Sequence, residues 1–135
     1  MLVKNLSVSS KLKRKEKERD MAEMQFAVEM GMGTDLKGED YTKAACRAVH
    51  DALHRNFLTI WHAFDFPLER MIVKIRIGVT EPEKVNIDRV KEEAPAGCVS
   101  VEVVEGGARI DMLEHVTVVA NAIVTVSYDV ERKVQ

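Results

Sequence analysis

Apolar and polar residues alternate along parts of the chain with a period of two, which predicts β-strands. In the first such stretch Met24, Phe26, Val28 and Met30 are expected to face the core. In the second stretch, residues 71–79, apolar residues occupy every other position and are also expected to face the core. They are Met71, Val73, Ile75, Ile77 and Val79. Four strands are expected in total, at residues 24–30, 71–79, 97–104 and 116–128, with a short extra strand as an option near 108–111.

A helical spacing of apolar residues separates the first two strands. It predicts a helix from Tyr41 to about Leu58, with Asp40 as its N-cap. A second, shorter helix is expected at 87–93, capped by Asn86. The stretch 59–70 follows no clear pattern. The apolar stripe of the long helix consists of Ala45, Val49, Ala52, Leu53 and Phe57.

The resulting order, β-α-β-α-β-β, predicts an α+β fold with a four-stranded mixed sheet and two helices on one face. Alternation within the strands leaves the other face more polar. That face also carries Val119 and Ile123, so it is either solvated or buried against another subunit. Its expected polar residues are Gln25, Glu29, Lys74, Arg76, Glu102, Asn121 and Thr125.

Charge divides the chain into a basic N-terminal segment and an acidic remainder. Residues 1–20 hold seven basic and three acidic residues and are expected to be a flexible or helical extension. Residues 21–135 are expected to form one domain, because 135 residues with 46% hydrophobic content suit a single core. The acidic balance of this domain opposes nucleic-acid binding.

Several classes of protein are disfavoured by what the sequence lacks. No apolar run approaches the roughly 20 residues of a membrane-spanning helix. The two cysteines, Cys46 and Cys98, are far apart, which argues against a zinc site or a disulfide framework. Without a secretory h-region, a cytoplasmic location is expected.

The residues most suited to function are those of the segment 31–38, Gly-Met-Gly-Thr-Asp-Leu-Lys-Gly, expected to form a loop between the first strand and the long helix. Gly31 and Gly33 allow a sharp turn and a close approach of the backbone, because they have no Cβ. A helix N-terminus favours an anion. Three nearby carboxylates would repel a phosphate, however, and the spacing matches no nucleotide motif. A nucleotide cradle is therefore disfavoured.

Asp35 is the central candidate within this loop. It could act as a general base or substrate anchor, with Lys37, Lys43 or His50 supplying positive charge beside it. The alternative is that Asp35 closes a turn through its side chain while Asp40 caps the helix. Both interpretations stay open.

The sequence offers two sets of residues that resemble metal ligands. Glu29, Asp35 and Asp40 offer hard oxygen ligands for Mg²⁺ or Ca²⁺, without an EF-hand pattern. His50 and His54 have the spacing of a two-histidine site, but lack the glutamate of HExxH and share their helix face with two basic residues. No metal site is predicted, and no cofactor is identified.

The sequence resembles a family of short conserved proteins of unknown function that is identified by a GxGxDxHG motif, which is GMGTDLKG here. The resemblance covers about residues 22–130, with Lys37 at the histidine position. It implies no activity, but it favours a functional loop as much as one that is only a turn. The resemblance continues through 40–49, 77–85, 103–107 and 119–122.

The order of elements is similar to the chorismate-mutase-like fold, whose members commonly form trimers with small-molecule clefts between subunits; a ferredoxin-like arrangement is the alternative. The first functional hypothesis is a homo-oligomer, trimeric or dimer-based, that binds a small polar metabolite at the 31–38 loop, with catalysis open. The second is a non-catalytic interaction module that uses the polar face of its sheet. The expected ligand contacts are Glu29, Gly31, Gly33, Asp35, Gly38 and Asn121.

Overall fold

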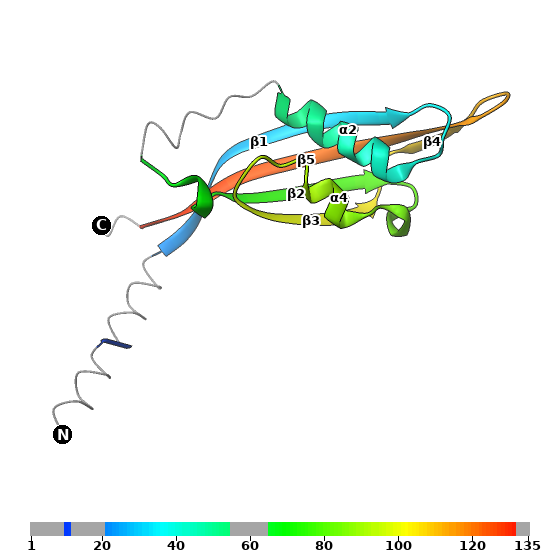
Figure 1. Cartoon of the computed structure of the whole chain (residues 1–135). Coiled ribbons are helices and arrows are strands. Elements are labelled where there is room, and N and C mark those ends of the chain that lie inside the picture. The colour runs from blue at the N-terminus through cyan, green and yellow to red at the C-terminus, as the bar shows by residue number, and fades with distance from the viewer. Residues whose placement is uncertain (1–9, 12–20, 55–64, 132–135) are drawn as a thin grey trace.

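A curved sheet with helices on one face forms the body of the protein (Figure 1). The computed structural model describes residues 10–11, 21–54 and 65–131. Short 3-10 turns precede β2 and follow it, at Leu68–Arg70 and Pro82–Lys84. The longer elements are β1 (Met21–Asp35), α2 (Tyr41–His54), β2 (Ile72–Val79), α4 (Ile87–Lys91), β3 (Cys98–Glu105), β4 (Ala108–Asp111) and β5 (Val116–Glu131).

The strand order is β1-β5-β2-β3. β2 and β3 run parallel, whereas β5 is antiparallel to β1, β2 and β4. The mixed sheet and the β-α-β-α-β-β order are therefore confirmed, with the short optional strand, β4, as a fifth strand in the described part of the chain. The ferredoxin-like alternative requires β-α-β-β-α-β and does not apply.

β4 follows β2 along the same side of β5. β2 pairs with β5 as far as Gly78 opposite Asn121, and β4 pairs with it from Ala108 opposite Val119. The chain passes from β3 into β4 at the Gly106-Gly107 turn, which lies against Gly78 of β2 and in which Gly107 has a φ of 61°. Glycine tolerates this left-handed conformation because it has no Cβ. A hairpin of β4 and β5 is thereby placed at one end of the sheet.

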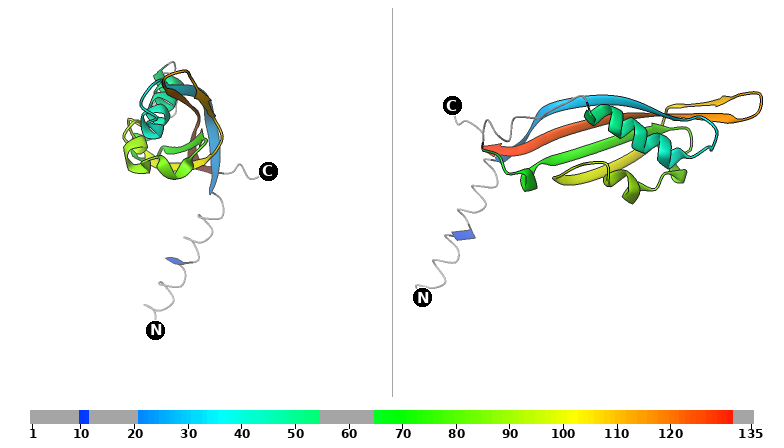
Figure 2. Two further views of the ribbon diagram at one scale, coloured as in Figure 1. Left: turned by 90° about the vertical axis from the view of Figure 1, so that its right-hand side faces the viewer. Right: turned by 45° about the horizontal axis from the view of Figure 1, so that its top comes forward.

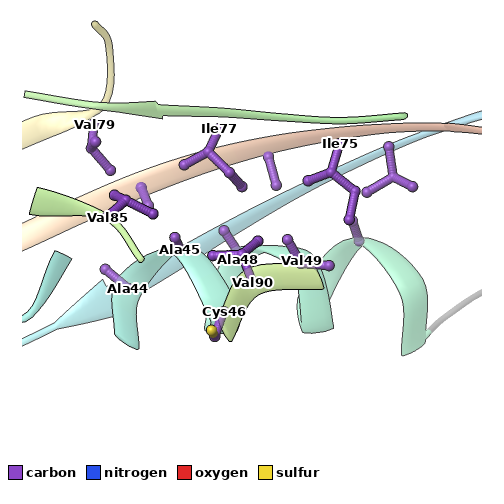
Figure 3. Close-up of a cluster of buried hydrophobic side chains, with 14 of the residues drawn as sticks. Ala44, Ala45, Cys46, Ala48, Val49, Ile75, Ile77, Val79, Val85 and Val90 are labelled. Carbon is purple, nitrogen blue, oxygen red and sulfur yellow. The ribbon is translucent and has the colours of Figure 1, made fainter. Parts of the chain in front are cut away.

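Both helices cover the same face of the sheet (Figure 2). The apolar residues of β2 point at them, as the alternation predicts, and Val73, Ile75, Ile77 and Val79 are at most 3% exposed. Figure 3 shows three of these side chains, Ile75, Ile77 and Val79, above the alanines and Val49 of α2. This layer is the core, and it is built of small aliphatic side chains, as the low aromatic content requires.

β1 is longer than expected and contains a β-bulge between Gln25 and Ala27. One extra residue reverses the facing of every later side chain in a strand. Val28 and Met30 consequently lie on the open face, 44% and 73% exposed, instead of in the core. Glu29, expected on the polar face, is half-buried on the α2 face. The predicted facing of this strand is wrong from the bulge onward.

Both helices begin where the sequence predicts, but α4 ends at Lys91, before the expected end at residue 93. α2 begins at Tyr41 as expected and is described to His54, so its expected last turn, with Phe57, lies outside the described residues. So do most of the N-terminal extension and residues 59–64 of the 59–70 connection. Asn86 caps α4 as predicted, its side chain accepting a hydrogen bond from the Arg89 N–H at 3.2 Å. Within the described residues, no helix is long and apolar enough to cross a membrane.

Candidate functional site

Gly31 and Gly33 lie where α2 crosses β1. A Cβ on Gly31 would lie 2.2 Å from the carbonyl oxygen of Ala48, and one on Gly33 would lie 2.3 Å from that of Ala44. These distances are far inside van der Waals contact, and the opposing atoms are backbone. The close approach expected from the sequence exists, but the element that makes it is α2. The two glycines therefore set the position of this helix on the sheet.

The predicted loop at 31–38 is mostly strand, because β1 continues to Asp35. Asp35 is 5% exposed, and its Oδ2 accepts a hydrogen bond from the Asp40 N–H at 2.9 Å. A Cβ on Gly38 would lie 2.8 Å from the same oxygen. The carboxylate thus closes the short connection from β1 to α2, which is the turn-closing interpretation of Asp35. Glu39 adopts a φ of 48° within this tight turn.

The first turn of α2 is fixed at two points. Asp40 caps it as predicted, with its Oδ1 accepting a hydrogen bond from the Lys43 N–H at 3.0 Å. Tyr41, 2% exposed, donates its hydroxyl to Glu81 Oε2 at 2.6 Å, and Lys84 Nζ lies 3.1 Å from the same oxygen. The start of α2 is thereby tied to the turn that follows β2.

The hydrogen bond between Tyr41 and Glu81 shifts the pKa of both side chains. The hydrogen bond to Glu81 raises the pKa of Tyr41, and the same bond, with help from Lys84, lowers the pKa of Glu81. Sequence reasoning missed the contact because its partners are 40 residues apart. No local spacing signals such a pair.

A groove of about 480 Å³ runs between α2 and α4. It begins at the capping residue of α2 and continues along the side of the helix that carries its basic residues. Two of the predicted candidates, Lys43 and His50, lie on its wall, but Asp35 does not line it. The lining residues are Asp40, Thr42, Lys43, Cys46, Arg47, His50, Arg89 and Glu93.

The three cationic side chains of the groove, Lys43, Arg47 and Arg89, differ in their distance from the nearest carboxylate. Lys43 Nζ and Arg47 Nη1 each lie 3.9 Å from Asp35 Oδ1, which is too long for a hydrogen bond. Their side chains are 53% and 51% exposed. On the α4 wall, Arg89 is paired with Glu93 at 2.9 Å. The groove can therefore present three cations to an anionic group.

The Cys46 thiol also lines the groove. The residue is 8% exposed, and its burial raises the pKa of the thiol. A thiol with a raised pKa is a poor nucleophile, because the thiolate is the reactive form. Cys46 therefore contributes an apolar surface to the groove, not a reactive group.

The other predicted contacts are dispersed. Glu29 lies on the α2 face of the sheet and Asn121 on the open face, so the sheet separates them. Lys37 is exposed in the turn before α2. The rings of His50 and His54 stack 5.6 Å apart on the outer side of α2. Among the described residues, no three His, Cys, Asp or Glu side chains gather as metal ligands would.

The residues that sequence reasoning missed lie mainly on α4. Arg47 is one of the two basic residues that share a helix face with His50 and His54, so its position follows from helical spacing. Arg89 and Glu93 face that helix because α4 packs against α2, with the Cys46 Sγ 4.0 Å from the Arg89 carbonyl oxygen. Such packing between distant segments has no signature in a single sequence.

The model of a family described as conserved hypothetical protein (Lin0512_fam) matches residues 25–126. The chain belongs to the Lin0512 family. The matched range includes β1 from before its glycines, both walls of the groove and most of β5. The family's description carries no activity, so the site has to be interpreted from its own geometry.

A solved structure extends the comparison. The Lin0512-family chain is 31% identical to a FtsZ-like protein of unknown function from Nostoc punctiforme, with a TM-score of 0.75. The alignment covers 82% of this chain and 99% of that one. No curated protein matches the chain. The α+β fold with its mixed sheet is thus shared with a protein whose function is also unknown.

Proposed function

We propose that this Lin0512-family protein binds a small polar metabolite with an anionic group, phosphate or carboxylate, in the groove between α2 and α4. The observation that carries the proposal is the convergence of Lys43, Arg47 and Arg89 on one hollow of about 480 Å³. Lysine and arginine donate charge-assisted hydrogen bonds to both kinds of oxyanion. The hollow has the size of a small-molecule site.

The existing contacts leave these cations able to bind a ligand. Lys43 lies 3.9 Å from Asp35 and has no hydrogen bond to it. Arg47 donates its Nη1 to the Thr34 carbonyl oxygen at 2.6 Å, and Arg89 donates its Nη1 to Glu93, so each guanidinium keeps its remaining N–H groups for a ligand. The two carboxylates of the lining are already engaged, Asp40 with the first turn of α2 and Glu93 with Arg89. An incoming oxyanion therefore meets free N–H donors before it meets free carboxylates.

In this proposal the predicted candidates take different roles. Lys43 contacts the ligand, and His50, further along the same wall, supplies a hydrogen-bonding group. Asp35 is a positioning residue, because its carboxylate holds the turn from which α2 begins. The raised pKa of Cys46 argues for binding rather than for attack by a thiolate.

The test is isothermal titration of the full chain with pyrophosphate and, separately, with citrate, at constant ionic strength. Lys43→Gln and Arg89→Gln should each weaken the binding of at least one probe by about tenfold, as expected for loss of a charge-assisted hydrogen bond. Lys74→Gln is the matched control, because its side chain is 54% exposed, against 53% for Lys43, and lies on the opposite face of the sheet. Failure of both probes to bind, or an equal effect of Lys74→Gln, contradicts the proposal.

A further inference from the structure

The hairpin of β4 and β5 extends beyond the body of the molecule (Figures 1 and 2). Its turn is closed by a hydrogen bond from the Met112 N–H to the His115 carbonyl oxygen at 2.8 Å. Leu113 is fully exposed at the tip, and Met112 and Ile110 are 51% and 47% exposed. Turn tips usually carry polar residues, so three apolar side chains at one tip indicate a surface that is covered in an assembly.

A second feature lies on the open face of the sheet, away from both helices. β2, β3 and β5 form a hollow of about 320 Å³ there. Ile123, 39% exposed, contributes its apolar side chain, and Lys74 and Arg76 stand at the rim with side chains 54% and 61% exposed. The lining residues are Lys74, Ile75, Arg76, Ser100, Val101, Glu102, Ile123 and Thr125.

The hairpin tip and the hollow are complementary in charge and polarity. Met112 and Leu113 stand between two exposed acidic residues, Asp111 and Glu114. In the hollow, an apolar surface lies beside Lys74 and Arg76, which remain more than half exposed although each has an ion pair with a neighbouring glutamate. An apolar tip flanked by carboxylates therefore fits a hollow that contains Ile123 and two exposed cations, where Asp111 and Glu114 would share Lys74 and Arg76 with their present partners, Glu23 and Glu102.

A chain cannot insert its own tip into its own hollow. Val116 at the base of the hairpin and Ile123 in the hollow lie on the same strand, β5, seven residues apart. At about 3.3 Å per residue they are about 23 Å apart along the strand, and the hairpin leads further away. Only a second molecule can bring the two surfaces together.

We propose that the β4–β5 hairpin of one chain docks into the open-face hollow of a second copy of this chain. The contact joins two different surfaces, so it is head-to-tail and builds a closed ring or an open chain of molecules. It uses the face opposite the α2–α4 groove. This inference therefore stands independently of the proposed metabolite binding.

The experiment measures the molar mass of the full chain by light scattering after size-exclusion chromatography. Leu113→Glu at the tip and Ser100→Glu in the hollow, which sets a carboxylate against Asp111 and Glu114, should each reduce the assembly to monomer. Both positions are exposed, so neither change disturbs the core, and circular dichroism confirms folding. The matched control is Ile87→Glu, on α4, where the side chain is 40% exposed; it should leave the assembly unchanged.

A mixture of the two variants tests whether the tip of one molecule docks into the hollow of another. The tip variant keeps a working hollow, and the hollow variant keeps a working tip, so an equimolar mixture should form a dimer of one molecule of each. A monomeric wild-type chain would overturn the proposal. So would a Leu113→Glu variant that still assembles, or a mixture that stays monomeric.

Discussion

Replacing Gly33 with alanine tests whether the glycines of β1 serve the packing of α2. The new Cβ would lie 2.3 Å from the Ala44 carbonyl oxygen, 2.3 Å from the Ala48 nitrogen and 2.7 Å from the Arg47 carbonyl carbon. All three atoms belong to the backbone of α2, so no side-chain movement can relieve the clash. The helix as a whole has to move away from the sheet.

The size of the effect follows from these distances. Ordinary contact begins near 3.4 Å, so α2 must retreat by roughly 1 Å, and overpacking of this kind costs about 1–3 kcal/mol. Alanine gains back about 0.5–1 kcal/mol over glycine through the unfolded state. The difference between these two terms is an expected loss of about 1 kcal/mol in the free energy of unfolding of Gly33→Ala, or roughly 0.5 M in the urea midpoint.

The assay is urea unfolding followed by circular dichroism, with Gly78→Ala as control. Gly78 also lies in a strand, but a Cβ there would meet Gly106 Cα at 3.4 Å, an ordinary contact. Gly78→Ala should have an unfolding free energy equal to that of wild type or higher by up to about 1 kcal/mol. If Gly33→Ala were as stable as this control, the glycines would not be determining the helix position and the reasoning would be refuted.

Two further predictions concern ionisable groups. The lowered pKa of Glu81 contributes stability that is present above its ordinary value of 4.5 and is lost as the pH falls through the lower, folded-state value. Tyr41→Phe, which removes the largest cause of that shift, should flatten the fall of the urea midpoint at acidic pH; an unchanged fall would contradict it. In the native protein Ellman's reagent should modify the exposed Cys98 quickly and the buried Cys46 slowly, because burial both shields that thiol and raises its pKa. Equal rates would show that Cys46 is accessible.

How far the sequence predicts the fold differs between two strands. In β2 every expected core residue is buried, because an uninterrupted strand preserves its alternation. In β1 the same rule fails after the bulge. Phe26 lies at the bulge, and its ring centroid is 6.0 Å from that of Tyr128. Phe26 therefore packs as the alternation in the sequence predicts, although the facing of the strand reverses directly after it. Nothing local signals that the facing of Val28 and Met30 has reversed.

The candidate site divides in a similar way. Lys43 and His50 share a helix face by their spacing, and that face does line the groove. The close approach at Gly31 was also predicted, but its partner, α2, was not. The sequence does not predict that Arg89 lies beside Lys43, because this position depends on how two helices pack against each other on one face of the sheet. The sequence predicts which residues share a face of one helix or strand, whereas contacts between elements are seen only in the three-dimensional structure.

Ligand binding in the α2–α4 groove is the central functional claim, and a residue-resolved titration tests it most directly. In ¹⁵N-labelled full-length protein, pyrophosphate or citrate should shift the backbone amide signals of Lys43, Arg47 and Arg89 in a saturable way. Signals of Lys74 and Arg76 on the opposite face should stay in place. Saturable shifts confined to that opposite face, or no saturable shift with either probe, would contradict the claim.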